Sequence, residues 1–275
     1  MGLLDDIIAR KRAEVEALLR VPRSPSMRAR DDVAGTLIRN RAPGESLRLL
    51  AEVKLRSPSA GPLSRALTPA ARALAYAEEG AAMVSILCDS SFFDGSWSHL
   101  SQARERLDAA GRRATPLLAK EFVLDGRQVQ EAKDRGASAV LLIARIVDGP
   151  TLQRLADTAR EEGIDPLVEV ADERELVMAL EVGARAIGVN ARDLDTLAVD
   201  SARAARVLDA IPSGVVAVHL SGLREASDVQ RIAESRADAA LVGEALMRDD
   251  DPRPRLRAMV EAARGRGQQE TSRRS

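Results

Sequence analysis

Short, almost uninterrupted runs of apolar residues recur along the chain, separated by longer segments with helical spacing. The apolar runs are residues 49–53, 83–87, 116–119, 139–143, 166–168, 186–189, 215–218 and 239–242. Each run is too short for a helix and lacks polar alternation, which is typical of parallel strands buried on both faces. The segments between them, such as 69–79, 126–135, 151–162 and 173–181, place Ala and Leu on one face of a predicted helix.

Several of these helical segments end in a glycine followed by an alanine. Gly80, Gly136 and Gly183 each lie between a predicted helix and the next predicted strand, where a left-handed cap would end the helix. Strand and helix alternate through eight units, which predicts an α/β protein with a single (β/α)8 TIM barrel. An open, doubly wound sheet is the alternative, but no G-x-G-x-x-G motif follows the first strand.

The barrel pattern does not cover the whole chain. Residues 1–47 precede the first strand and contain an apolar helical stripe of Leu3, Leu4, Ile7, Ile8, Val15, Leu18 and Leu19. We therefore predict an N-terminal helical extension packed on the barrel, and a barrel over residues 48–263. Residues 264–275 are polar and are expected to form a disordered tail.

Composition narrows the class of protein. The chain has 275 residues and a formal net charge of -1, so no overall positive field favours binding to nucleic acid. No apolar run reaches membrane-spanning length, and no apolar signal segment follows the basic residues near the N-terminus. A single cysteine, Cys88, excludes a disulfide within the chain. These features predict a cytoplasmic protein.

Polar residues end several of the predicted strands. Glu52 and Lys54 follow the first strand, Lys120 the third, Glu169 the fifth and Asn190 the sixth. The active site of such a barrel lies at the carboxyl ends of its strands. A structural network of ion pairs around the barrel mouth is the alternative for any one of these residues. Together they indicate acid–base chemistry on an anionic substrate.

Glycine turns and phenylalanines add two features to this predicted site. The last two strands run into Ser221-Gly222 and Gly243-Glu244, the usual positions of a barrel phosphate site. Aromatic residues make up only 2% of the chain, yet all its phenylalanines, Phe92, Phe93 and Phe122, follow the second and third strands. Ordinary loop packing is the alternative, but the clustering favours a pocket for an aromatic ring.

Metal and triad chemistry have little support in the sequence. His99, His219 and Cys88 do not form a set with metal-ligand spacing, so no metal site is expected. Ser221 lies near His219 but lacks the G-x-S-x-G frame of a nucleophilic serine.

Motifs at these strand ends resemble those of the indole-3-glycerol phosphate synthase family. They are AEVK at 51–54, SPS at 57–59, FFDGS at 92–96, LAKEF at 118–122, PLVEV at 166–170 and IGVNARDL at 187–194. The resemblance implies ring closure of 1-(2-carboxyphenylamino)-1-deoxyribulose 5-phosphate, with loss of carbon dioxide and water, to indole-3-glycerol phosphate. This reaction belongs to tryptophan biosynthesis and needs no cofactor. Other enzymes of that pathway are the implied candidate partners.

The resemblance also implies roles for individual residues. Lys120 would be the general acid and Glu169 the acid–base group of dehydration, with Lys54, Glu52 and Asn190 completing the catalytic set. Ser57 and Arg192 would hold the substrate carboxylate. The ring pocket would consist of Phe93, Phe122, Leu141, Leu194 and Leu197. Phosphate would bind at the turns of Ser221, Gly222, Gly243 and Glu244.

Two positions depart from the family pattern. Where the family usually has Glu before the Ser-Gly of the seventh strand, this chain has Leu220, and where it often has Ser after the eighth-strand glycine, Glu244 stands. A carboxylate cannot donate to phosphate, so Glu244 is expected to point away. Two alternatives stay open. One is a paralogue that uses the same chemistry in secondary metabolism. The other, which Leu220 favours, is a catalytically silent barrel that binds a phosphorylated ligand or acts as an assembly partner.

Overall fold

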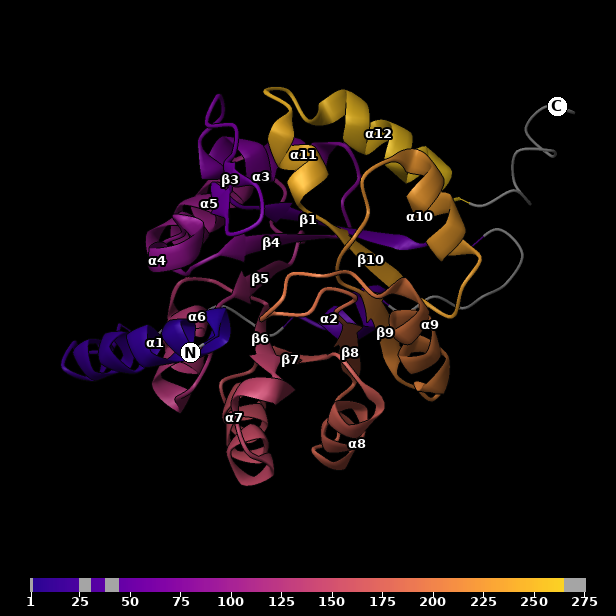
Figure 1. Cartoon of the computed structure of the whole chain (residues 1–275). Helices are drawn as coiled ribbons and strands as arrows, with labels where there is room; N and C mark the ends of the chain where they lie inside the picture. Colours follow the sequence, from indigo (N-terminus) through magenta and orange to yellow (C-terminus); the bar gives the residue numbers. More distant parts are fainter. Residues whose placement is uncertain (1, 25–30, 38–44, 265–275) are drawn as a thin grey trace, which may run out of the picture.

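The computed structural model describes residues 2–24, 31–37 and 45–264, and its centre is a closed barrel of parallel strands (Figure 1). The barrel strands are β1 (Arg48–Val53), β4 (Met83–Leu87), β5 (Leu117–Lys120), β6 (Ala139–Ile143), β7 (Asp165–Val170), β8 (Ala186–Val189), β9 (Val216–His219) and β10 (Ala239–Val242). β1 pairs with β10 on one side and with β4 on the other, which closes the sheet. The predicted barrel is confirmed, and the open-sheet alternative is wrong.

Helices connect successive strands and surround the barrel (Figure 1). They are α3 (Pro69–Glu78), α4 (Ser90–Phe93), α5 (Trp97–Ala109), α6 (Gly126–Asp134), α7 (Gly149–Glu161), α8 (Glu173–Glu181), α9 (Ser201–Ala210), α10 (Ala226–Ala233), α11 (Glu244–Arg248) and α12 (Arg253–Ala262). Gly80, Gly136 and Gly183 have φ angles of 93°, 87° and 66°, so the predicted left-handed caps are confirmed. A short pair of strands, β2 (Arg56–Ser57) and β3 (Gly61–Pro62), follows β1.

Apolar side chains form two layers. One lies between the strands and the surrounding helices and includes Val84, Leu142 and Ile187. The other fills the barrel interior with residues such as Leu50 and Leu141. Because successive side chains of a strand point to opposite faces, unbroken apolar runs supply both layers at once.

The two segments that precede the barrel contact its interior layer. α2 (Val33–Leu37) is tied to the start of β7, since the backbone N–H groups of Val33 and Ala34 donate to Asp165 at 2.9 and 3.3 Å. α1 (Leu3–Leu19) lies beside α6 (Figure 1) and contributes Leu4 and Ile7 to the interior apolar cluster.

The predicted apolar stripe of α1 is only partly the buried face. Leu4, Ile7 and Val15 are buried, whereas Leu19 is 57% exposed. Lys11, which is not a member of the predicted stripe, is buried with them. The division at residue 47 stays a prediction, and the expected tail lies outside the described residues except for Arg264.

Candidate functional site

A cavity of about 630 Å³ lies where the barrel strands end. Every residue to which the resemblance assigns a role lines it: Glu52, Lys54, Ser57, Phe93, Lys120, Phe122, Leu141, Glu169, Asn190, Arg192, Leu194, Leu197, Ser221, Gly222, Gly243 and Glu244. Phe92, the other phenylalanine of the predicted aromatic cluster, is absent from the lining. Residues from all eight barrel strands, or from the loops that follow them, therefore meet around one space, because the parallel strands of a closed barrel bring their carboxyl ends to the same rim. The structure brings these residues together, and their individual roles stay predictions.

A polar network joins the ends of β5, β7 and β8. Lys120 Nζ lies 3.4 Å from Glu169 Oε2, and Asn190 Nδ2 donates to Glu169 Oε1 at 2.8 Å. Ser221 Oγ in turn donates to Asn190 Oδ1 at 2.9 Å. The Glu169 side chain is 4% exposed and that of Lys120 is 19% exposed, so the carboxylate is fixed while the ammonium still reaches the cavity. This arrangement can deliver and accept protons at one point.

A second pair of opposite charges lies at the end of β1. Lys54 Nζ donates to Glu52 Oε1 at 2.7 Å, and both side chains are largely buried. Glu52 Oε2 is buried and has no hydrogen-bond partner among the described residues. A Cβ added at Gly243 would collide with Glu52 Oε1, so the glycine makes room for the carboxylate. The unpaired oxygen can accept a hydrogen bond from a ligand hydroxyl.

The apolar side of the cavity contains two aromatic rings. Those of Phe93 and Phe122 have their centroids 6.1 Å apart and are tilted by 34°, a favourable aromatic contact. Leu3 and Ile7 of α1 also line the cavity. Sequence reasoning missed them as site residues, because an apolar stripe shows that a helix packs and does not show where.

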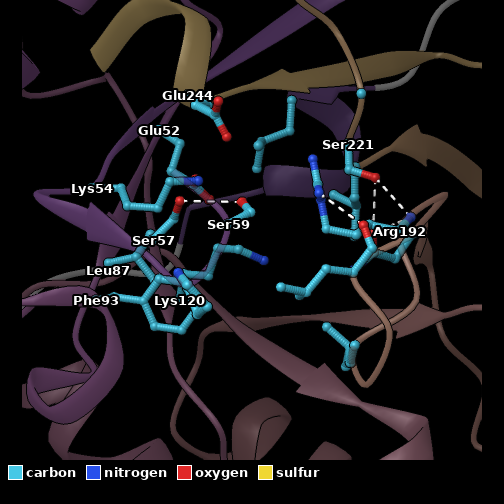
Figure 2. A pocket seen from close by; sticks show the side chains of 18 of the residues that line it. Glu52, Lys54, Ser57, Ser59, Leu87, Phe93, Lys120, Arg192, Ser221 and Glu244 are labelled. Atoms are coloured by element: carbon cyan, nitrogen blue, oxygen red, sulfur yellow. Dashed lines mark hydrogen bonds and ion pairs between the residues drawn. The ribbon is translucent and has the colours of Figure 1, made fainter. Parts of the chain in front are cut away.

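Arg192 and Ser57 lie on opposite sides of the cavity (Figure 2). Arg192 donates to the carbonyl oxygen of Leu197 at 3.0 Å, and Leu197 itself has a φ of 60°, an uncommon left-handed conformation for a leucine. Ser57 Oγ accepts from the backbone N–H of Ala60 at 3.1 Å and lies 3.3 Å from Ser59 Oγ. Each group is therefore held by its own loop and faces the cavity from its own side.

The turn after β9 has the features of an anion site. Gly222 has a φ of 90°, and neither Gly222 nor Leu223 donates a backbone hydrogen bond to a described residue. Three arginines missed by sequence reasoning, Arg224, Arg248 and Arg255, also line the cavity. The only feature of the sequence that could have indicated these arginines as site residues is their position after the last two strands.

Glu244 lines the same corner and is paired with Arg248 at 2.7 Å. Although partial burial acts to raise the pKa of Glu244, the charge of Arg248, assisted by Lys54 and Arg192, lowers it below its ordinary value. The carboxylate is therefore ionised and neutralised by a neighbour on the same helix. This pairing leaves the backbone of the turn to meet an anion.

Leu220 lines the cavity where the family pattern has a carboxylate. Its side chain is 4% exposed and packs over Gly188, where a Cβ would collide with it. His219, one residue earlier, is buried and is absent from the cavity lining, as strand alternation predicts. Burial lowers the pKa of His219 below its ordinary value.

The described residues contain neither a metal-binding cluster nor a membrane-spanning helix. Among residues 2–24, 31–37 and 45–264, no group of three or more His, Cys, Asp or Glu side chains has the geometry to hold a metal ion. Within the same ranges, no helix has both the length and the apolar character needed to cross a membrane.

Comparisons with known proteins agree with the motifs of the site. The family model described as "Indole-3-glycerol phosphate synthase" matches residues 4–259. The chain is 41% identical to an indole-3-glycerol phosphate synthase of Chlorobium phaeovibrioides, over 90% of this chain and 95% of that protein. It is 40% identical to one of Nocardioides sp., over 94% of this chain and 98% of that protein.

Solved structures support the fold alone. The 3-hexulose-6-phosphate synthase of Salmonella typhimurium superposes with a TM-score of 0.59 at 16% identity, covering 79% of this chain and 98% of that one. A thiamine phosphate pyrophosphorylase from Pyrococcus furiosus has the same TM-score at 14% identity, covering 79% and 95% of the two chains. The match of the family model over nearly the whole barrel, together with relatives at about 40% identity, shows that the chain belongs to the indole-3-glycerol phosphate synthase family.

Proposed function

We propose that this chain is an indole-3-glycerol phosphate synthase, a carboxy-lyase of tryptophan biosynthesis. It would convert 1-(2-carboxyphenylamino)-1-deoxyribulose 5-phosphate into indole-3-glycerol phosphate, carbon dioxide and water. The observation that carries this proposal is the contact of Lys120 with a Glu169 carboxylate that Asn190 holds, inside a cavity with an aromatic side. Family membership supports the same activity.

Lys120 is proposed as the general acid of ring closure. As the aromatic carbon that bears the carboxylate attacks the ketose carbonyl, the carbonyl oxygen gains negative charge and takes a proton from the ammonium. Loss of carbon dioxide then restores the aromatic ring. The position supports this role, because Lys120 ends β5 beside Phe122, so its Nζ reaches the cavity next to the aromatic side.

Glu169 is proposed as the acid–base group of the dehydration that follows. It would take a proton from the ring-closed intermediate and give it to the hydroxyl group, which leaves as water. Asn190 donates to one oxygen of Glu169 and so orients the other toward Lys120. Lys54 would meet the negative charges of the substrate, and the unpaired oxygen of Glu52 would accept a substrate hydroxyl.

Substrate binding divides among three parts of the cavity. The aromatic ring would lie against Phe93 and Phe122, with Leu141, Leu194 and Leu197 completing the apolar pocket. Arg192 and Ser57 would hold the carboxylate. The phosphate would bind at the turns of Ser221-Gly222 and Gly243-Glu244, where Gly222 has no intramolecular acceptor for its N–H among the described residues.

The proposal also covers the cofactor requirement, the location and the partners of the chain. No cofactor is assigned, because protons and charge suffice for a decarboxylation that restores aromaticity. Cytoplasmic location and contact with other enzymes of the tryptophan pathway are proposed on the strength of the family and the single cysteine. A role of the same chemistry in secondary metabolism remains the alternative.

The direct test is incubation of the purified protein with the carboxyphenylamino deoxyribulose phosphate while indole absorbance and fluorescence are followed. Lys120→Ala should lower kcat by about 10²–10⁴-fold, the usual contribution of a general acid. Glu169→Gln should lose a comparable amount and accumulate a ring-closed intermediate. Glu105→Gln, the same change on the exposed face of α5, is the matched control and should keep the parental kcat.

Two outcomes would contradict the proposal. Absence of product from the parental protein would exclude the activity. Parental kcat in both Lys120→Ala and Glu169→Gln would show that the reaction takes place elsewhere.

A further inference from the structure

α1 has one charged side chain on its buried face. Lys11 is 1% exposed and lies among the apolar residues that dock the helix. Its Nζ is 2.5 Å from Glu14, 2.9 Å from Glu121 and 3.0 Å from Asp89. Asp89 and Glu121 are themselves 0% and 3% exposed, so one ammonium joins two buried carboxylates that come from different barrel loops.

Such a buried cluster is stable only while its charges remain paired. Burial by itself would lower the pKa of Lys11, but the carboxylates of Glu121 and Asp89 raise it above the ordinary value, so the lysine stays charged. Burial raises the pKa of Glu121 to about 7, although Lys11 opposes that shift. Removal of the ammonium would leave the carboxylates facing one another without a counter-ion.

Each of the two buried carboxylates also fixes a segment that carries a site residue. Asp89 Oδ1 accepts from the backbone N–H of Phe92 at 2.7 Å and so begins α4, which carries Phe93. Glu121 is the residue directly after Lys120, and its Oε1 accepts from the N–H of Phe122 at 2.8 Å. The loops after β4 and β5 are therefore tied to α1 through Lys11.

One more hydrogen bond and two apolar side chains of α1 connect this helix to the same part of the site. Ser91 Oγ of α4 donates to Glu14 Oε1 of α1 at 3.0 Å. Leu3 and Ile7, on the same face of α1 as Lys11, line the cavity and pack in the same apolar cluster as Phe93 and Phe122. The docking of α1 thus determines both part of the apolar wall and the anchoring of the two loops.

We propose that Lys11 is a positioning residue for the reaction: through Asp89 and Glu121 it holds Phe93 and Lys120 in place, although it touches no substrate. The inference rests on the proposed function for its kinetic consequences. Placement errors of about 1 Å can cost an enzyme roughly 10²-fold in rate. Loss of this single ammonium should therefore reduce turnover without removing any group that contacts the substrate.

The kinetic test compares Lys11→Met with Arg12→Met, which removes the same charge from the exposed side of α1 one residue later. Lys11→Met should lower kcat about 10–100-fold, and Arg12→Met should match the parental protein. The inhibition constant of inorganic phosphate should remain parental in both variants. The proposed phosphate turns follow β9 and β10, which β1 separates from β4 in the barrel.

A second readout needs no activity. Trp97 is the only tryptophan of the chain and begins α5 directly after the α4 loop. That loop is bound back to Asp89, whose carbonyl accepts from Gly95 N–H at 2.7 Å. The emission of ligand-free Lys11→Met should therefore shift relative to the parental protein, and that of Arg12→Met should not.

The outcomes separate this inference from the proposed function. Parental kcat and Trp97 emission in Lys11→Met would overturn the inference while leaving the function intact. An equal loss of kcat and of phosphate affinity, with lower Tm, would show a merely structural role and would also overturn it. Absence of turnover in the parental protein would overturn the function, and Trp97 emission would still test the positioning.

A milder variant covers the case in which Lys11→Met does not fold. Glu121→Gln keeps an acceptor for the N–H of Phe122 and removes only the charge that faces Lys11. It should lower kcat several-fold with unchanged Trp97 emission, because the link through Asp89 remains. Parental kcat in this variant would contradict the role assigned to the Glu121 link.

Discussion

Leu220 is one of the two site residues at which the sequence departs from the motifs expected by its resemblance to the family. It replaces a carboxylate with an apolar group that packs over Gly188 in the barrel interior. Both lysines of the site nevertheless have carboxylate partners, since Lys54 pairs with Glu52 at 2.7 Å and Lys120 lies 3.4 Å from Glu169. Leu220 therefore leaves neither lysine of the site without a counter-charge.

We accordingly expect the natural sequence to be active and Leu220→Glu to change kcat/KM by less than about 10-fold, or about 1.4 kcal/mol. The variant should also unfold more easily, by about 1–3 kcal/mol, because its carboxylate would enter an apolar cluster without a donor in place. Steady-state assays and urea unfolding of both proteins measure these effects. No product from the natural protein, together with turnover in Leu220→Glu, would instead establish the silent-barrel alternative.

Among the elements, the turn between β9 and α10 carries the proposed phosphate site. Its form follows from Gly222, whose φ of 90° is left-handed and favours glycine. An added Cβ there would meet only Val199 at 3.6 Å, so a larger residue would be strained by the backbone and not by collision. The geometry of the turn, and with it the direction of its N–H groups, depends on this one position.

Gly222→Ala should therefore weaken phosphate binding. Strain of about 1–3 kcal/mol would shift the turn, and the inhibition constant of inorganic phosphate should rise about 10-fold while kcat at saturating substrate changes little. Gly214→Ala is the matched control, because its Cβ would meet nothing within 4 Å. An unchanged inhibition constant in Gly222→Ala would place the phosphate elsewhere.

At the scale of the whole molecule, the two ends of the barrel differ in chemistry. α2 is tied by its backbone to the amino-terminal end of the barrel, whereas α1 adds apolar side chains to the cavity at the other end. Four charged residues of the cavity lie in two pairs of opposite sign, Lys54 with Glu52 and Lys120 with Glu169. Such lysine–glutamate pairs suit proton transfer by the protein's own side chains.

Turnover should therefore not depend on a divalent metal ion. The described residues contain no group of His, Cys, Asp and Glu side chains suited to hold one, and acid–base groups are already paired in the cavity. Assays with and without a strong chelator should give the same kcat and KM. Activity that disappears with the chelator and returns with an added divalent ion would refute this expectation.

What the sequence by itself determined is the repeating pattern and the residues at its strand ends. Unbroken apolar runs specify buried parallel strands, and positions such as Lys120 and Glu169 follow from the rule that barrel sites lie at carboxyl ends. The tertiary structure decided which of these residues touch. The contact of Glu169 with Lys120 and Asn190, and the burial of Lys11 between Asp89 and Glu121, join residues far apart in the chain. Local pattern reports only which face a residue occupies, whereas these contacts depend on how the closed barrel and α1 are packed in space.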